Sequence, residues 1–145
     1  MAKIWEGIKV GLAAIGGAAA FFWGGMDNLL IALIVFAAVD YATGVLAAII
    51  NKKLSSAVGF KGIAKKVLMF LIVGIANVID VRLIQTGSGF RTATIIFYIA
   101  NEGVSLLENA TRCGLPVPKK LKIILMQLHE KTEEEENKKN DNDTQ

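Results

Sequence analysis

The sequence is poor in the residues from which disulfides, metal sites and most catalytic centres are built. Its 145 residues include one cysteine, Cys113, and one histidine, His129. A single residue of each kind excludes an internal disulfide and a metal framework of cysteines or histidines. The sequence also has no Ser/His/Asp arrangement and no phosphate-cradling glycine loop. We therefore predict that the protein is not an enzyme and has no cofactor.

Charged residues are also few, at 20% of the chain, and the net charge is only +3. The densest group of lysines lies in one short stretch beside apolar segments, which is not how a nucleic-acid-binding face is built. We predict no nucleic-acid partner. The chain is instead 53% hydrophobic, with a mean hydropathy of +0.48. Such values indicate a membrane protein.

The first residues have a lysine followed by an apolar run, as a secretory signal peptide does. Bulky residues stand where a cleavage site needs small ones: Phe21, Phe22 and Trp23. We interpret this region as a retained part of the protein.

Four apolar segments have roughly the length that a helix needs to cross a bilayer, about 20 residues. They cover residues 10–26, 28–50, 67–84 and 92–109. The second and third each hold twelve Leu, Ile, Phe or Val residues, which is enough to insert despite their acidic residues. The first holds five and the fourth seven, and Glu102 nearly cancels the insertion energy of the fourth. The sequence therefore predicts two firm spans and two marginal ones.

The basic stretch 51–66, interpreted as a loop, sets the predicted orientation. Short loops rich in lysine stay on the cytoplasmic side, and this one has no acidic residue but five lysines: Lys52, Lys53, Lys61, Lys65 and Lys66. If all four segments span, both termini are cytoplasmic. If the first lies on the surface, three spans remain and the N-terminus is outside. In both cases the C-terminus is cytoplasmic.

The C-terminal part has a different character. Gly114 and two prolines end the fourth helix. Residues 119–131 then show helical spacing of apolar residues with lysines at the start, which predicts a short amphipathic helix on the membrane surface. Residues 132–145 have no hydrophobic residue and should be a disordered acidic tail. The predicted fold is thus an all-α integral membrane protein with three to four transmembrane helices, this amphipathic helix and the tail.

Three polar residues lie within or at the end of the firm spans: Asp40, Asn77 and Asp80. Such groups face protein or water rather than lipid. The first interpretation is hydrogen bonding in a packed helix interface, and the alternative is an ion or proton relay. We favour packing, because no intramembrane cation is available as a fixed partner for Asp40.

Small residues recur at four-residue steps in the first segment, at Gly16, Ala20 and Gly24, and in the second Gly44 follows Asp40 on one face. Faces of this kind let helices pack closely in lipid. We interpret them as candidate helix–helix contacts, and chance in a Gly/Ala-rich run is the alternative.

The fourth segment concentrates its polarity on one stripe of a helix. The stripe contains Asn101, Glu102, Ser105, Glu108 and Asn109. Several copies arranged in a ring would turn the stripe toward a shared water-filled lumen, so these are candidate pore-lining or oligomer-facing residues. Two alternatives stay open: a helix lying flat at the interface, and pairing of Glu102 or Glu108 with Arg112 or Lys65 inside one chain.

Several of these stretches, in this order, resemble a known family. They are DYATGVLAAIINKKLSS (40–56), KGIAKK (61–66), the Asp80 that ends the third segment, YIANEGVSLLENA (98–110) and GLPVP (114–118). The sequence resembles the phage holins of the toxin-secretion/phage-lysis type, which include clostridial toxin-secretion-like holins. The acidic tail departs from the basic C-terminus common among holins.

This resemblance implies a homo-oligomer in the cytoplasmic (inner) membrane of a bacterial host. It would form a pore that releases an endolysin or a large toxin, without necessarily binding either, and would time lysis by a bacteriophage. Two other functions stay open: a small regulatory, antiholin-like membrane protein and a small ion-channel subunit.

Overall fold

The structure, a computed structural model, describes residues 1–121, 123, 124, 126 and 127. These residues form helices and no strand. A π-helical turn, Asp80–Ile84, extends α3, and the α-helices are α1 (Ala2–Trp23), α2 (Asn28–Ile50), α3 (Ser56–Ile79) and α4 (Gly89–Arg112). The predicted all-α class is confirmed.

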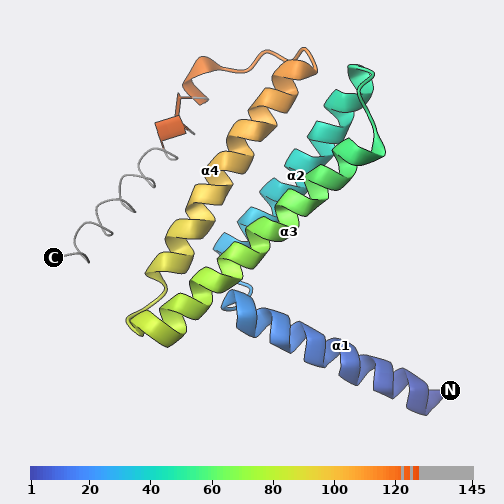
Figure 1. Ribbon diagram of the computed structural model, residues 1–145, viewed down its shortest axis with the longest axis vertical. Helices are drawn as coiled ribbons and strands as arrows, with labels where there is room; N and C mark the ends of the chain where they lie inside the picture. The colour runs from blue at the N-terminus through green and yellow to red at the C-terminus, as the bar shows by residue number, and fades with distance from the viewer. Residues whose placement is uncertain (122, 125, 128–145) are drawn as a thin grey trace.

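Helices α2, α3 and α4 run up, down and up in one bundle (Figure 1). Helix α4 packs closely on α2 and also on α3, whereas α2 and α3 meet over a smaller area. Completely buried side chains fill the space between the helices, among them Leu30, Leu33, Val73 and Ile95. At about 1.5 Å per residue, each helix is about 35 Å long, which exceeds the roughly 30 Å of a hydrocarbon core.

Three helices are long and apolar enough to cross a membrane: α1, α2, and α3 with its π-helical turn. Large apolar side chains of α2 and α3 point away from the bundle and are exposed, including Val35, Leu46, Leu68 and Ile75. Such an outward face suits lipid. Helix α4 has a similar length but carries more polar residues, and it buries many of them against its neighbours.

Helix α3 begins earlier than the apolar segment 67–84. The Ser55 side chain accepts a hydrogen bond from the Val58 amide at 3.2 Å and caps the helix. Most of the stretch 51–66 is therefore helical, and only residues 51–55 connect α2 to α3. The predicted loop was too long because charged residues end the apolar pattern from which the segment was recognised. Lysine nevertheless favours the helix, so α3 includes these lysines. Lys65 and Lys66 lie on α3 as a result.

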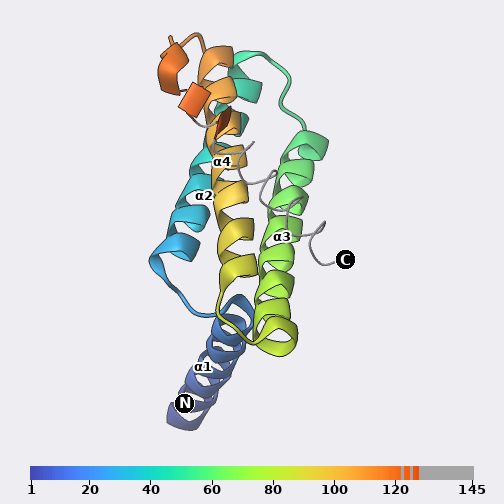
Figure 2. The same cartoon turned by 90° about the vertical axis from the view of Figure 1, so that its left-hand side faces the viewer.

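Helix α1 projects from the base of the bundle rather than running beside it (Figures 1 and 2). Most of its length is exposed, and only its last turn packs on α3. The Trp23 indole nitrogen donates to the Phe70 carbonyl at 2.9 Å. The Phe22 ring lies directly on Gly74, where a Cβ atom would be 1.8 Å from the ring. Gly74 thus has no space for a side chain.

After α4 the chain turns at Gly114, which has a positive φ of 83°. Residues 119–121, 123, 124, 126 and 127 are helical, in the part of the chain for which the sequence predicts an amphipathic helix. Their exposed apolar side chains include Leu121, Ile123, Ile124 and Met126. The rest of 119–131 and the predicted tail 132–145 lie outside the described residues.

Candidate functional site

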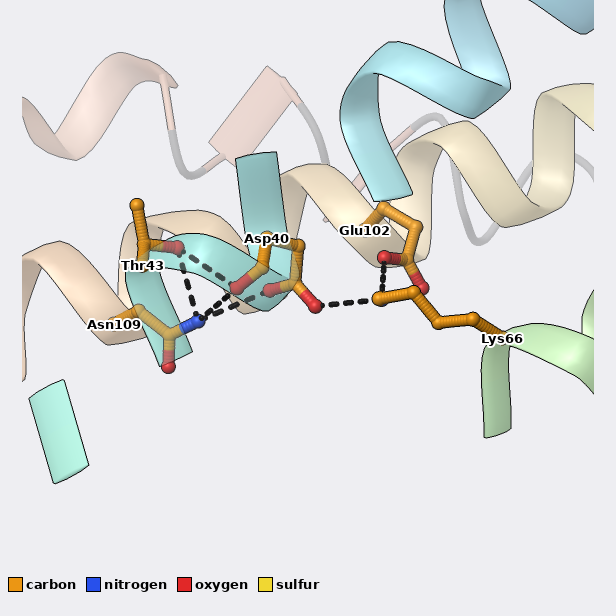
Figure 3. A network of polar contacts seen from close by, with 5 residues as sticks. All are labelled: Asp40, Thr43, Lys66, Glu102 and Asn109. Atoms are coloured by element: carbon orange, nitrogen blue, oxygen red, sulfur yellow. Dashed lines mark hydrogen bonds and ion pairs between the residues drawn. The ribbon is translucent and has the colours of Figure 1, made fainter. Parts of the chain in front are cut away.

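Four polar side chains from three helices meet inside the bundle, and we call them the interhelical network: Asp40 of α2, Lys66 of α3, and Glu102 and Asn109 of α4 (Figure 3). The Lys66 ammonium donates to Asp40 Oδ2 at 2.8 Å and also to Glu102 Oε2. Lys66 therefore ties all three helices together through one group.

Asn109 completes the network from the other side of Asp40. Its Nδ2 donates to Asp40 Oδ1 at 3.0 Å and to the Asp40 carbonyl at 3.3 Å. It also lies 3.3 Å from Thr43 Oγ1. Gly44 faces the Asn109 amide, and a Cβ atom there would lie 3.4 Å from Asn109 Nδ2, in ordinary van der Waals contact. The candidate contact face of the second segment thus serves packing between α2 and α4 of one chain.

The interpretation that Asp40 has no cation as a fixed partner is wrong, because Lys66 binds it. The error follows from placing Lys66 in a loop. Glu102 does form an ion pair within one chain, as one of the alternatives predicted. Its partner is Lys66 rather than Arg112 or Lys65. Lys65 and Lys66 are adjacent on α3, but Lys65 is exposed whereas Lys66 is partly buried.

The network contains two carboxylates for one ammonium. The Lys66, Asp40 and Glu102 side chains are only 16%, 12% and 14% exposed. Charges withdrawn from water are unfavourable unless they are paired and hydrogen bonded. Here the two carboxylates share a single ammonium group as their positive partner. The network therefore needs polar surroundings rather than hydrocarbon.

A polar groove of about 690 Å³ between α2, α3 and α4 supplies such surroundings. Asp40, Lys66 and Glu102 line its inner part, and it extends along the bundle to Lys53 and Arg112. In Figure 2 the start of α3 stands apart from α2 and α4 at this end. Ionisable groups deep in the bundle are thus connected to one end of it by a polar path.

The predicted polar stripe of α4 divides between two environments. Asn101, Glu102, Ser105 and Asn109 line the groove, so their side of α4 faces α2 and α3 of the same chain. Glu108 is exposed and lies outside the groove. The structure therefore brings four of the five stripe residues together with Asp40 and Lys66.

A second polar group, which we call the junction cluster, lies at the opposite end of the bundle and consists of Asp27, Asp80 and Arg91. Arg91 is 3% exposed, and its Nη1 donates to Asp27 Oδ2 at 2.6 Å. Its Nε donates to the Trp23 carbonyl and its Nη2 to the Gly25 carbonyl. The Arg91 guanidinium lowers the pKa of the Asp27 carboxyl, through this hydrogen bond above all. Arg91 thereby fastens the α1–α2 connection to α4.

Asp80 and Asn77 fix the same junction from α3. Asp80 is 2% exposed, and its carboxylate accepts from the amides of Phe90 and Arg91 at 3.1 and 2.7 Å, which caps the first turn of α4. The Asn77 amide donates to the carbonyls of Phe21 and Phe22, both at 3.2 Å. Both predicted polar residues therefore bond to backbone groups at this junction.

Within a single chain, the small residues of the first segment do not form one contact face. Gly24 ends α1 with a φ of 76°, and a Cβ atom there would be 2.3 Å from Asn77 Oδ1. Ala20 is partly buried, whereas Gly16 has no atom within 4 Å of such a Cβ. Sequence analysis missed Arg91 as a structural residue. The Gly24–Gly25 helix stop followed by Asp27, a strong N-cap, was the available signal for the junction.

Within the described part of the chain, no three His, Cys, Asp or Glu residues come close enough together to hold a metal ion. Chemically, the interhelical network holds three charged side chains and an amide in one hydrogen-bonded group inside the bundle.

Comparison with known proteins gives a consistent result. A model described as the bacteriophage holin family matches residues 17–130. An uncharacterized 14.9 kDa protein in the nagH 3' region of Clostridium perfringens is 42% identical over 132 residues, which are 90% of this chain and 99% of that protein. An uncharacterized protein of Listeria innocua is 40% identical over 131 residues, which are 90% and 93% of the two chains.

A protein of Bacillus phage phi105 described as a probable holin is 35% identical over 108 residues, which are 72% of this chain and 79% of that protein. No solved structure matches the chain. The family match covers the whole bundle and the polar groups described above. With three helices that are long and apolar enough to cross a membrane, the chain is a membrane protein and belongs to the bacteriophage holin family.

Proposed function

We propose that this protein is a holin that assembles with further copies of itself and opens a hole in the cytoplasmic membrane, through which an endolysin reaches the cell wall. The observation that carries the proposal is the interhelical network, which keeps three ionisable side chains inside a membrane bundle of a holin-family chain. Ionisable groups at such depth are unfavourable in lipid and mark functional sites.

The polar face of α4 has two sets of possible partners. In the single subunit, Glu102 is bonded to Lys66 and faces α2 and α3. In an assembled ring, water and neighbouring subunits would replace these partners for Asn101, Glu102 and Ser105. The exchange is feasible because the groove already leads to one end of the bundle, so that water replaces a hydrogen bond without a dry intermediate.

The orientation follows from the basic end of the bundle. The lysines in the first turns of α3 and Arg112 at the end of α4 lie at the same end of the bundle, opposite the junction cluster (Figure 1). From the excess of lysine we infer that this end of the bundle lies on the cytoplasmic side. The polar groove then opens toward the cytoplasm, where an endolysin accumulates.

Expression with and without an endolysin tests the proposal. Sudden lysis that requires both proteins is expected, and folded enzyme should pass the membrane. Selective ion currents without passage of protein would instead identify a small ion channel, and continued growth with both proteins would contradict a holin.

Leucine substitutions test the role of the α4 stripe. Glu102→Leu and Ser105→Leu should each change the lysis time or the size of the hole, whereas Glu108→Leu, on the exposed side of the helix, should change neither. Ser105→Leu leaves every bond of Lys66 intact, so its effect separates the lumen from folding. If timing and permeability stay unchanged in both stripe variants at normal membrane levels, the stripe does not line the hole.

A further inference from the structure

A second groove continues the polar one along α2 and α3. It measures about 550 Å³ and is almost entirely apolar, with Ile34, Ala38 and Phe70 among its lining residues. Tyr41 and Lys66 line both grooves and mark the boundary between them. The apolar part reaches down to Trp23 at the base of the bundle. We call the two adjoining grooves together the path: its upper part carries polar and basic side chains, and its lower part is apolar.

The polar end of this path carries unpaired positive charge. Lys53, Lys65 and Arg112 line its opening, and all three are exposed. In the part of the chain that the structure describes, none of them forms an ion pair, whereas Lys66 is bound by Asp40 and Glu102. The Asn51 side chain also lines this groove, and its amide group donates to the carbonyls of Ala47 and Arg112. The opening is thus suited to an anion.

We propose that this path binds one anionic phospholipid, with its phosphate at Lys53, Lys65 and Arg112 and an acyl chain in the apolar groove between α2 and α3. Basic pockets between membrane helices at the cytoplasmic side bind anionic head groups, and the volume lies in the usual range of ligand sites. The site does not depend on pore formation, since it lies within a single subunit.

Two other occupants fit the path less well. Free phosphate would use the basic opening and leave the apolar groove without a function. Helix α1 of a second copy is apolar and exposed, but the one acidic side chain of α1, Glu6, lies near the end of a helix that also carries Lys3 and Lys9. Only an amphiphile with a negative head group complements both parts of the path.

Quenching of Trp23 fluorescence measures occupancy directly, because Trp23 lines the apolar part. The full chain with Trp5→Phe, in detergent micelles, is titrated with phosphatidylglycerol or phosphatidylcholine carrying the same brominated acyl chains. We expect saturable quenching by phosphatidylglycerol at concentrations where phosphatidylcholine quenches weakly. Equal quenching by the two lipids would overturn the proposal, because the charge at the opening would then have no role.

Two matched lysines on α3 test the head-group end. Lys65→Gln should weaken phosphatidylglycerol binding about fivefold, the usual effect of one basic residue near an anionic lipid surface. Lys61→Gln is the control, because Lys61 is exposed on the same helix but does not line the groove. Equal losses in the two variants would show diffuse attraction to the basic end and would contradict a defined site.

Two matched alanines on α2 test the acyl-chain end. Ala38→Phe fills the apolar groove and should reduce quenching severalfold, whereas Ala42→Phe, exposed one turn later and outside the groove, should not.

Competition by soluble glycerol 3-phosphate as strong as that by phosphatidylglycerol would identify a phosphate site instead. Trp23 fluorescence that changes on dilution of the protein, and that is independent of the lipid head-group charge, would identify α1 of a second copy as the occupant. Either result overturns the proposal.

Discussion

The junction cluster and the interhelical network both bury charge, but they use it differently. In the junction cluster, Asp80 accepts from two backbone amides and Arg91 donates to two backbone carbonyls. In the interhelical network, the charged groups bind one another: Lys66 holds the side chains of Asp40 and Glu102 beside a polar groove.

This difference separates a fixed end of the bundle from an exchangeable one. Backbone groups cannot leave their helices, so the bonds of the junction cluster last as long as the fold does. Side chains beside a polar groove can exchange partners for water or for a neighbouring subunit at a small change in free energy. We therefore expect the junction end to govern stability and the network end to govern function.

The largest effect is expected for Arg91→Met, which leaves Asp27 and two backbone carbonyls without their donor. The Asp27 side chain is 46% exposed and stays hydrated, but each hydrogen bond that the buried guanidinium donates to a carbonyl contributes about 1.5–3 kcal/mol to the free energy of unfolding. Thermal unfolding in detergent and the amount of protein in the membrane measure the loss. Arg82→Met, an exposed arginine in the π-helical turn, is the control and should be close to wild type. Equal stability of the two variants would remove the distinction between the two ends.

A smaller loss of stability is expected for Lys66→Met, because the network borders a polar groove. Loss of a hydrogen bond to a charged group reduces stability by about 1.5–3 kcal/mol. The triple variant with Asp40→Asn and Glu102→Gln should recover much of this, since no uncompensated carboxylate remains. Lysis timing should change in Lys66→Met more than in Lys65→Met. If the triple variant is no more stable than Lys66→Met, charge pairing is not what Lys66 provides.

The smallest effect is expected from acid. Arg91 depresses the pKa of Asp27 in the folded state, so this contribution to stability is present above the unfolded value of about 3.8. It is lost as the pH falls through the lower, folded pKa. The midpoint of thermal unfolding should therefore fall on acidification more steeply in the wild type than in Asp27→Asn. Parallel curves for the two proteins would show that Asp27 adds nothing to the junction.

Hydrophobic patterning predicted the helices well. The segment 28–50 coincides with α2, the segment 67–84 lies in α3 and its π-helical turn, and residues 92–109 lie inside α4. Patterning works here because a span needs a fixed length of apolar residues, whichever partners it later meets. The confinement of polarity to one face of α4 was also visible, because it depends only on helical periodicity.

The partners of the polar residues could not be predicted in the same way. Lys66 binds Asp40 only because α3 continues through its lysines and crosses α2 at the matching height, which is a property of the assembled bundle. Arg91 lies between two apolar segments of the sequence, yet it is buried because the α1–α2 connection folds over it. The direction of α1 has no signal in its own composition.

The π-helical turn and residues 85–88 make α3 and α4 a tight hairpin, and this has a consequence for biosynthesis. The bonds from Asp80 to Phe90 and Arg91 join residues only 10 and 11 positions apart, so they can form as soon as α4 leaves the ribosome. Helix α4 is a poor candidate for insertion alone, because of Glu102. As part of a hairpin, α4 would enter the bilayer together with the lysine of α3 that binds this carboxylate.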